Sequence, residues 1–583
     1  MISFVIHVVI NTSIYALLAL SLNLQYGLTG LPNFGHVMFF AMGAYVSAIL
    51  FQAGISTWVG WFVAVGVGAI AGWLITQPVR RLKPEYWALA TLGAAEIFRL
   101  IMQNESRIAG GSIGISGIRP IADPPFFAAI MVSLVVVTFL MNEHISQSAF
   151  GRTIRVIRED ETMAAALGRD VYSCQVRAMM LGGAIAALSG FAYAHYISFV
   201  SPEGFLPIET FFVWTMVILG GRGNNFGVIF GAVVLVTMSA STRFVAEWSN
   251  VPPTVVGTFR IMIFGLLLVA LVLFRRKGIF PERKRIYQLS TPIMAQQEGP
   301  HEMQYSSLHS NAVTGADAAS GRAGASDLPI VRIEWVSKRF GGVQALKDVT
   351  MQIPRGRVTG LIGPNGSGKS TLFDVVSGVV PLDSGRVYLE ENEIDNRRPD
   401  LAARQGIIRT FQIPRIARQM TVLENLLFAR MNQQGEHLIK LFTPGAQSSL
   451  RHEGEILLKE AITILELLDL RHMANEYAGI LSGGQLKLLS VGLVLMANPE
   501  VMLLDEPTAG VNPILIRRIM YTLAELRTRG RTLLIIEHNM QVIAEACETV
   551  YVLNAGEIIA NGSPHEVRLN RAVIAAYLGT TAE

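Results

Sequence analysis

The 583-residue chain is too long for one ordinary domain. Its composition indicates that one part contacts membrane lipid and another part contacts water. Hydrophobic residues make up 51% of the chain and charged residues only 16%, whereas soluble proteins carry about 25% charged residues. The apolar stretches lie before about residue 275, and the charged residues crowd the later half. A formal charge of +4 is small for this length, so the pI near 9.0 is a membrane-topology signal and argues against nucleic-acid binding.

The cysteines argue against a disulfide or a metal site, and the N-terminal stretch argues against a cleaved signal peptide. Cys174 and Cys547 have neither a pairing pattern nor metal-ligand spacing, so we expect reduced structural thiols. The apolar stretch from Met1 to Tyr26 lacks a basic start and a small-residue cleavage site, so we expect a retained membrane span and not a removed signal.

The first half contains about nine apolar segments that are candidates for membrane spans, each judged against the roughly 20 residues that a crossing helix needs. The seventh segment is short, which favours a broken or re-entrant element. The segments lie near residues 3–26, 33–53, 57–76, 86–103, 125–142, 178–199, 207–220, 226–243 and 257–274.

Basic loops predict the orientation of these spans, because Lys and Arg are retained on the cytoplasmic side. One set of loops is rich in them, and it places the N-terminus outside and the second half of the chain in the cytoplasm. The opposite loops hold only Arg107, Arg119 and Arg243. The basic loops carry Arg80, Arg81 and Lys83, then Arg152, Arg155, Arg158, Arg169 and Arg177, then Arg275, Arg276 and Lys277.

Small residues inside the spans predict close helix packing, and charged residues inside the spans have two possible roles. Glycines four apart, as in Gly68 to Gly72 and Gly227 to Gly231, predict close helix packing. Glu96 and Arg99 share one helical face, and Arg260 lies just inside the last segment. Charges at these positions mark either a substrate pathway or side chains that reach to the membrane interface, and the sequence leaves both readings open.

The longest basic loop runs from Glu143 to Ala178 and contains GRTIRVIREDETMAAALGRD. It predicts a short helix over residues 161–167 that Gly168 closes. A solvated loop is the plain alternative. Its length and position make this loop the best candidate for the element that receives force from the second half of the chain.

A stretch rich in Gly, Ala, Ser and Asp separates the two halves and predicts a flexible linker. The expected organisation is therefore a membrane domain over residues 1–285, a linker over 286–328 and a second domain over 329–583. The first is expected to be all-α and polytopic.

The second domain contains a phosphate-binding motif, the Walker A motif, between a predicted strand and a predicted helix. A strand-like run over Val358–Ile362 leads into GPNGSGKST, and a helical pattern follows from Leu372. Backbone N–H groups of such a loop bind phosphates at a helix N-terminus. Lys369 is expected to meet the β and γ phosphates and Ser370 the Mg²⁺ ion of bound ATP. The motif residues are Gly363, Pro364, Asn365, Gly366, Ser367, Gly368, Lys369, Ser370 and Thr371.

A second apolar run, Val501–Leu504, ends in two carboxylates. Polar residues at the end of a buried strand reach a ligand at the edge of the sheet. Asp505 therefore fits a ligand of Mg²⁺, and Glu506 fits the base that polarises the attacking water.

Between these motifs lies LSGGQ, and the order of the three resembles that of the ABC ATPase family. A glutamine in RTFQ and a histidine in IIEHN complete the pattern. The resemblance implies that Gln412 contacts Mg²⁺ and water, that His538 contacts the γ-phosphate and that Phe340 stacks on adenine. It also implies that Ser482, Gly483, Gly484 and Gln485 bind nucleotide, and that the domain has the α/β fold of a P-loop ATPase.

Both halves resemble one branch of this family, the branched-chain amino-acid importers. The ATPase half carries KRFGGVQAL, AGVNP and NGSPHEVRLNRAVIAAYLG, and the membrane half carries NFGHVMFFAMGAY, GRTIRVIREDE, SPEGF and ILGGRGNNFGVIFGA. Two departures are Asn512, where many ABC ATPases have Asp, and Leu493, where Arg is common. They bear on coupling between paired ATPases and not on the phosphate-binding residues.

The resemblance implies an ATP-hydrolysing permease subunit in a bacterial inner membrane. LSGGQ of one ATPase completes the Walker A site of another, so a partner is required: a second copy of this chain, or a separate permease and a separate ATPase. A periplasmic solute-binding protein would deliver branched-chain amino acids, with urea, short amides or aromatic acids as alternatives. The rivals are an exporter or flippase half-transporter, which would use about six long helices, and a non-transport ABC protein such as an ATP-dependent mechanical or regulatory factor.

Overall fold

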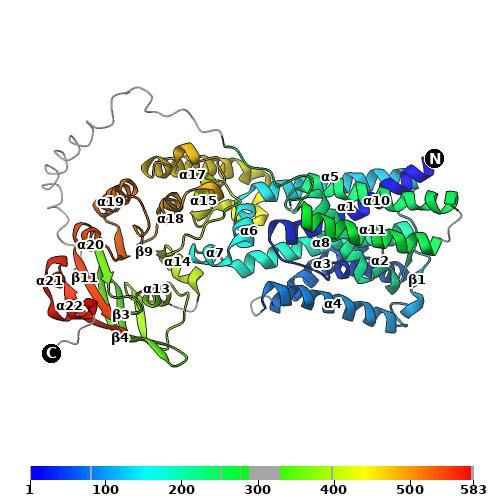
Figure 1. Ribbon diagram of the computed structural model, residues 1–583. Helices are drawn as coiled ribbons and strands as arrows, with labels where there is room; N and C mark the ends of the chain where they lie inside the picture. The colour runs from blue at the N-terminus through cyan, green and yellow to red at the C-terminus, as the bar shows by residue number, and fades with distance from the viewer. Residues whose placement is uncertain are drawn as a thin grey trace, which may run out of the picture. The chain divides into compact units, whose positions relative to one another are not determined.

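The computed structural model describes residues 2–78, 82–249, 253–275, 277–287, 329–394 and 398–578 (Figure 1). Arg80, Arg81 and Arg276, the side chain of Arg243, and all of the expected linker except its first two residues lie outside this part. The chain divides into two compact units. The first contains residues 1–165, 169–283 and 431–457, and the second contains residues 166–168, 284–430 and 458–583.

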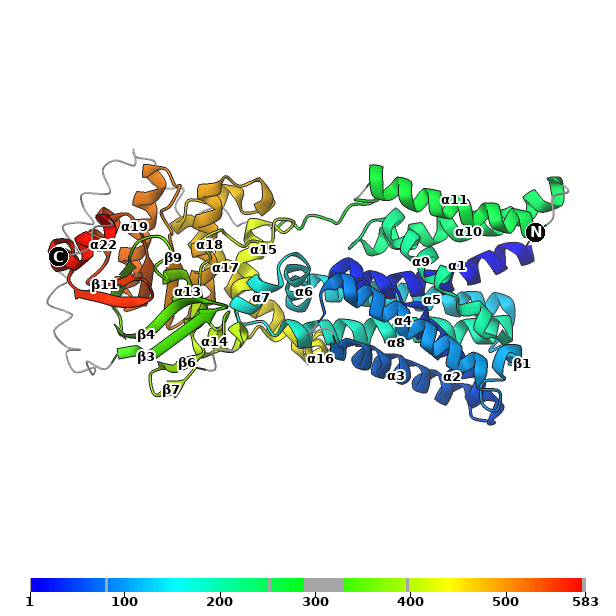
Figure 2. The ribbon, with the colours of Figure 1, turned by 60° about the horizontal axis from the view of Figure 1, so that its bottom comes forward.

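Each of the nine predicted apolar segments forms a helix, and the long ones run side by side in both ribbon views (Figures 1 and 2). Six of the described helices are long and apolar enough to cross a membrane. Two others, α2 and α9, are shorter, and α4 is less apolar. The nine helices are α1 (Ile2–Leu22), α2 (Val37–Gln52), α3 (Thr57–Thr76), α4 (Pro84–Asn104), α5 (Pro124–Gln147), α8 (Val171–Ile197), α9 (Pro207–Gly220), α10 (Asn225–Ser249) and α11 (Pro253–Phe274).

Short elements join these helices. A π-helical turn over Asn23–Leu28 extends α1, and a two-stranded antiparallel ribbon pairs β1 (Ile115–Ser116) with β2 (Phe199–Val200). A 3₁₀ turn over Pro202–Phe205 precedes α9.

The predicted close packing at glycines is confirmed. A Cβ on Gly68 would lie 2.4 Å from the carbonyl oxygen of Gly183, and a Cβ on Gly227 would lie 2.2 Å from that of Gly220. Bare backbone at these positions lets α3 approach α8 and α10 approach α9.

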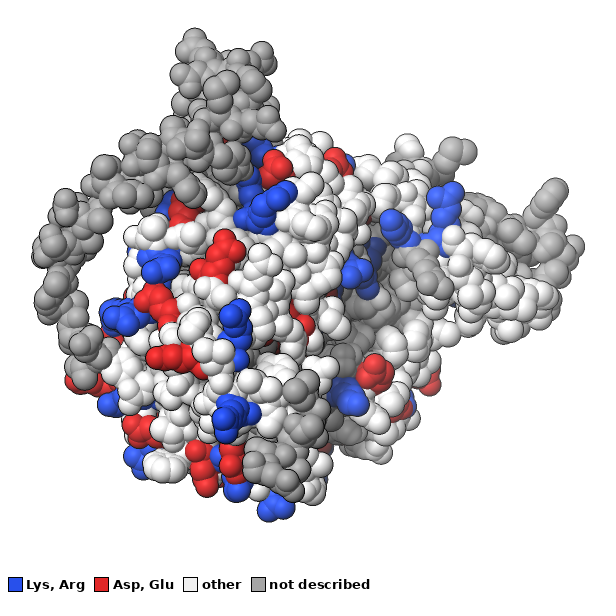
Figure 3. Space-filling view, turned by 60° about the vertical axis from the view of Figure 1, so that its left-hand side comes forward, with Lys and Arg blue, Asp and Glu red and all other residues white. Residues whose placement is uncertain are grey.

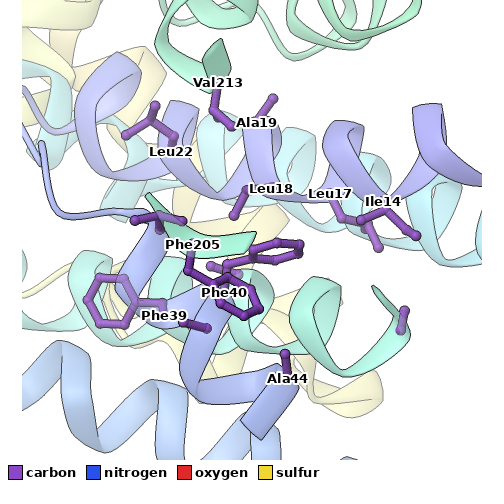
Figure 4. Packing of buried hydrophobic residues seen from close by; sticks show 14 of the residues in the cluster. Ile14, Leu17, Leu18, Ala19, Leu22, Phe39, Phe40, Ala44, Phe205 and Val213 are labelled. Atoms are coloured by element: carbon purple, nitrogen blue, oxygen red, sulfur yellow. The ribbon is translucent and has the colours of Figure 1, made fainter. Parts of the chain in front are cut away.

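Helix α1 lies at the centre of the apolar core of the first unit, and ten of its residues are buried. Leu18 of α1 points toward Phe40 of α2, whose ring contacts that of Phe205 in the 3₁₀ turn (Figure 4). A helix that is apolar all round in this way belongs in the interior of a bundle.

The loop between α5 and α8 contains two helices, so it is not the solvated loop that was the alternative to a predicted helix. It forms α6 (Ala149–Glu159) and α7 (Glu161–Ala166). The predicted short helix is confirmed, and Gly168 follows it with a φ of 81°. The sequence reading missed α6, although AFGRTIRVIRE repeats its apolar residues at helical spacing and buries Phe150 and Ile154.

Residues 431–457, from the ATPase half of the sequence, pack in the first unit with this loop. Arg169 pairs with Glu436 at 2.7 Å, and Arg152 donates to Gln433 Oε1 at 2.7 Å. His144 contacts the backbone oxygen of Leu441 at 3.0 Å. The elements here are η7 (Gln434–Glu436), α16 (Leu438–Phe442), η8 (Pro444–Ala446) and the start of α17 (Gln447–Leu467).

The second unit has two sheets. Six strands lie in the order β12-β11-β5-β10-β9-β8, parallel except for β12, and four lie in the order β4-β3-β6-β7, all antiparallel. The strands are β3 (Pro329–Phe340), β4 (Val343–Pro354), β5 (Val358–Ile362), β6 (Ser384–Leu389), β7 (Asn392–Glu393), β8 (Ile407–Arg409), β9 (Val501–Asp505), β10 (Thr532–Ile536), β11 (Thr549–Asn554) and β12 (Glu557–Gly562).

Helices of the second unit connect these strands. They are α13 (Lys369–Val376), α14 (Pro399–Gln405), α15 (Val422–Ala429), α18 (Gly483–Ala497), α19 (Pro513–Thr528), α20 (Met540–Ala546), α21 (Pro564–Leu569) and α22 (Arg571–Leu578), with 3₁₀ turns at Arg471–Met473 and Ala478–Ile480. Basic and acidic side chains intermingle on the face in Figure 3, without a single-sign patch. Cys174 and Cys547 are both free and buried.

Candidate nucleotide site

The loop between β5 and α13 carries the Walker A residues, and its glycines permit its backbone path. Gly363, Gly366 and Gly368 have φ of 153°, 78° and 105°, which side chains with a Cβ rarely adopt. A Cβ on Gly363 would lie 2.0 Å from the carbonyl oxygen of Leu553, and one on Gly368 would lie 2.4 Å from that of Ala345. Such a loop presents backbone N–H groups at a helix start, where a phosphate binds.

Lys369 begins α13 and lies against the loop that precedes it. Its Nζ donates to the carbonyl oxygens of Gly363 at 2.9 Å and Pro364 at 2.8 Å. Burial lowers the pKa of the Lys369 ammonium, and the two carboxylates that end β9 oppose that shift. The lysine and both carboxylates therefore share one electrostatic environment. Of the other motif residues, Ser367 is buried, Thr371 is half-buried, and Asn365, Gly366 and Ser370 are exposed.

Asp505, the last residue of β9, is 3% exposed. Its N–H donates to Thr410 Oγ1 at 2.9 Å, while its Oδ1 is buried and accepts no hydrogen bond from any residue that the structure describes. Burial raises the pKa of Asp505 to about 6, and the positive charge of Arg409 opposes the rise. A buried carboxylate oxygen with no donor fits a hard divalent cation such as Mg²⁺, which prefers oxygen ligands.

Glu506 follows at once and pairs with His538. The distance from Glu506 Oε1 to His538 Nε2 is 2.9 Å. Glu506 has a φ of 46°, unusual for a residue with a side chain, and its N–H donates to the carbonyl oxygen of Ile536 at 2.9 Å. Strained backbone held by its neighbours is typical of catalytic positions.

The sheet explains why these residues meet. Strand β10 pairs in parallel with β5 on one side and β9 on the other, so the carboxyl ends of all three strands lie at one edge. Walker A follows β5, the two carboxylates end β9, and His538 follows β10. Ligands of open α/β sheets bind at such an edge.

Three predicted groups lie outside this cluster. Gln412 is exposed after β8, and no hydrogen bond joins it to the other predicted site residues in the described part of the chain. Phe340 ends β3 of the other sheet, 48% exposed, with Lys338 Nζ 5.5 Å from its ring centre.

The third group is the LSGGQ motif, which begins α18. Ser482 and Gln485 form a capping box at its N-terminus, with Ser482 N–H donating to Gln485 Oε1 at 3.0 Å. Ser482 and Gly483 are exposed, and a Cβ on Gly483 would meet no atom within 4 Å. Gly484 and Gln485 are half-buried.

Sequence reasoning missed two residues that hold the site together. Lys487 Nζ donates to the carbonyl oxygen of Glu506 at 2.9 Å and also to that of Ala509. Arg409 pairs with Asp374 and lies with its guanidinium carbon 4.7 Å from the ring centre of Phe411. Lys487 lies two residues after LSGGQ, and Arg409 opens RTFQ, so proximity to the motifs was the available signal.

Family comparisons match both halves of the chain. The model described as the permease component of the branched-chain amino acid transport system matches residues 4–271, which favours the importer over the exporter alternative. The ABC transporter model matches residues 346–509, and the model described as branched-chain amino acid ATP-binding cassette transporter matches residues 557–583.

Curated relatives match the ATPase half. The chain is 41% identical over 256 residues to the probable branched-chain amino acid transport ATP-binding protein LivG of Methanocaldococcus jannaschii, covering 43% of this chain and 98% of that protein. It is 36% identical over 254 residues to the high-affinity branched-chain amino acid transport ATP-binding protein LivG of Escherichia coli strain K12, again covering 43% and 98%.

A solved structure matches the same region. It is the crystal structure of a nucleotide-free ATP-binding cassette from an ABC transporter, 40% identical, with a TM-score of 0.38 and coverage of 43% of this chain and 99% of that chain. The relatives and the family models together show that the chain belongs to the branched-chain amino-acid family of ABC transporters, as a multi-pass permease fused to an ABC-type ATPase that binds and hydrolyses ATP.

Proposed function

We propose that the chain is half of a bacterial inner-membrane importer that takes up branched-chain amino acids. The observation that carries this proposal is that two parts of one polypeptide, residues 4–271 and 557–583, match family models that are both described for branched-chain amino acid transport. In this proposal, residues 1–285 form the permease, 286–328 the linker and 329–583 the cytoplasmic ATPase.

The site residues then have defined tasks. Lys369 and the Walker A backbone hold the phosphates, while Ser370, Gln412 and Asp505 supply oxygen ligands to Mg²⁺. Glu506 polarises the attacking water, and His538, 2.9 Å from it, contacts the γ-phosphate. Phe340 stacks on adenine. The exposed LSGGQ residues complete the nucleotide site of a partner ATPase.

The partners are proposed from the family: a second permease, a second ATPase and a periplasmic solute-binding protein, in contact with membrane lipid. ATP closes the ATPase pair, and the α6–α7 loop transmits that movement to the permease. The contacts of Arg152, Arg169 and Arg177 with residues 433–436 support this role.

The test is uptake into vesicles. The transporter is purified through a tag on this chain together with its partner subunits and reconstituted with its binding protein. We expect ATP-dependent accumulation of L-leucine. Accumulation of urea, a short amide or an aromatic acid in its place would assign a different substrate, and ATP-dependent exit of solute would contradict import.

A further inference from the structure

A cavity of about 710 Å³ lies within the permease unit, lined by α1, α8, α9, α10 and α11. Three of these helices, α9, α10 and α11, lie along one side of the bundle in Figure 2. The cavity is unusual for a membrane interior because it holds a carboxylate and a guanidinium. Glu209 comes from the first turn of α9, and Arg260 from the first half of α11.

These two charges do not neutralise each other directly. No oxygen of Glu209 lies within 4.0 Å of a nitrogen of Arg260 in the described structure. Glu209 accepts a hydrogen bond from Tyr15 at 2.8 Å, and Arg260 donates to Ser239 Oγ at 3.2 Å. Among the described residues, one neutral hydroxyl forms a hydrogen bond with each charge, and the two charges attract each other only at longer range. A guanidinium has five N–H donors and a carboxylate accepts about four hydrogen bonds, so both groups keep capacity for a ligand.

Besides the polar side chains of His7, Asn11 and Thr242, the cavity has an apolar and aromatic wall. The rings of Phe212 and Phe264 lie 4.9 Å apart between centres, and Tyr15 meets Phe212 edge to face at 5.4 Å. Val236 and Ile208 complete this side. A volume of about 710 Å³ lies inside the range of small-ligand sites, about 300 to 1,000 Å³, and leaves room for water beside an amino acid.

We infer that this cavity binds the zwitterionic head of an α-amino acid, with its carboxylate on Arg260, its ammonium on Glu209 and Tyr15, and an apolar side chain against Phe212 and Phe264. Two opposite, separated and incompletely compensated charges match a ligand that carries the opposite charge at each end. A neutral urea or amide would leave both charges uncompensated, and an aromatic acid without an amine would leave Glu209 uncompensated. The inference deepens the proposed function and rests on it for the direction of transport.

The first experiment measures L-leucine uptake by vesicles carrying Arg260→Gln or Glu209→Gln transporters. We expect each variant to lose uptake by about tenfold or more, the factor that one charge-assisted hydrogen bond provides. The matched controls are Arg107→Gln and Glu105→Gln in the segment after α4, which remove a guanidinium and a carboxylate of the permease outside the cavity lining. These controls should retain uptake.

The second experiment probes the cavity without ATP. Ser239→Cys places a thiol beside Arg260, in a protein whose two native cysteines are buried. We expect L-leucine to slow its modification by aminoethyl methanethiosulfonate, whereas leucinamide, which lacks the carboxylate, and 4-methylpentanoate, which lacks the amine, should not. Ser241→Cys, exposed on the same helix and outside the cavity lining, is the matched control that leucine should leave unprotected.

The two experiments separate the inference from the proposed function. Wild-type vesicles that take up no L-leucine would contradict the proposed function, while protection of Ser239→Cys would still support the site. Wild-type rates of uptake in both cavity variants would overturn the inference even if import is established. The same holds if L-leucine gives no protection, or if leucinamide and 4-methylpentanoate protect equally well.

Discussion

Lys369 and Glu506 serve different steps of the ATPase reaction, so their loss should have different signatures. Lys369→Ala removes the cation that meets the phosphates, and we expect ATP binding and transport to be lost. Glu506→Gln keeps the shape and the contact with His538 but removes the base, so ATP should bind while turnover falls by about 10²- to 10⁴-fold. Nucleotide binding and phosphate release, measured on the purified transporter, check both. Wild-type turnover in either variant would contradict the assigned roles.

Lys487 is expected to position the catalytic segment without touching nucleotide. Its ammonium holds the carbonyl oxygens of Glu506 and Ala509. In Lys487→Met we expect a roughly tenfold lower kcat with little change in KM for ATP, because the segment after β9 loses about 1.5 to 3 kcal/mol of charge-assisted hydrogen bonding. Lys459→Ala, an exposed lysine on α17, is the control. A raised KM with an unchanged kcat would assign Lys487 to nucleotide binding instead.

The position of a single residue can be predicted from the sequence where a motif fixes the backbone. Walker A, the two carboxylates and His538 are at one sheet edge because each follows a neighbouring parallel strand. Lys487 was not predictable, because its partners are backbone oxygens that the fold brings near. Asn512, noted as a departure from the family, caps α19 by accepting from Leu515 N–H at 2.9 Å, a task that Asn performs as well as Asp.

Helices can be predicted from the sequence where one hydrophobic pattern dominates a segment. All nine apolar segments are helical, whereas the sequence predicts a loop where α6 forms. Its sequence is polar on one side, and its burial against residues 433–436 depends on a segment nearly 300 positions away. The grouping of residues 431–457 with the permease unit likewise follows from long-range contacts, which no local pattern encodes.

The ion pair between Arg169 and Glu436 tests the coupling role of this region. Arg169 is 4% exposed in its side chain and Glu436 20%, so removing one partner leaves a buried charge at a cost of about 2 kcal/mol or more. We expect Glu436→Arg to lose uptake and to lose stimulation of ATP hydrolysis by loaded binding protein. The swap Arg169→Glu with Glu436→Arg should recover both, measured together in vesicles. Full coupling in the single variant, or no recovery in the swap, would remove the pair from the coupling pathway.

At the scale of the whole molecule, one chain supplies one Walker A loop and one LSGGQ motif. Ser482 and Gly483 of the LSGGQ motif are exposed, as residues that receive a partner would be. The two LivG proteins match over 98% of their own length but over 43% of this chain, so each is an ATPase without a fused permease. We therefore expect this chain to pair with a different ATPase and not with itself.

Mixing two inactive variants distinguishes these arrangements. Lys369→Ala destroys Walker A and leaves LSGGQ intact, while Ser482→Arg blocks LSGGQ and leaves Walker A intact. In a pair of identical chains, a mixed dimer would regain one complete site, formed by the Walker A of the second variant and the LSGGQ of the first. We expect no such recovery when the two variants carry different tags, are co-expressed and are purified through both tags in sequence. ATP hydrolysis by doubly tagged material, absent from each variant alone, would establish instead that two copies of this chain form the transporter.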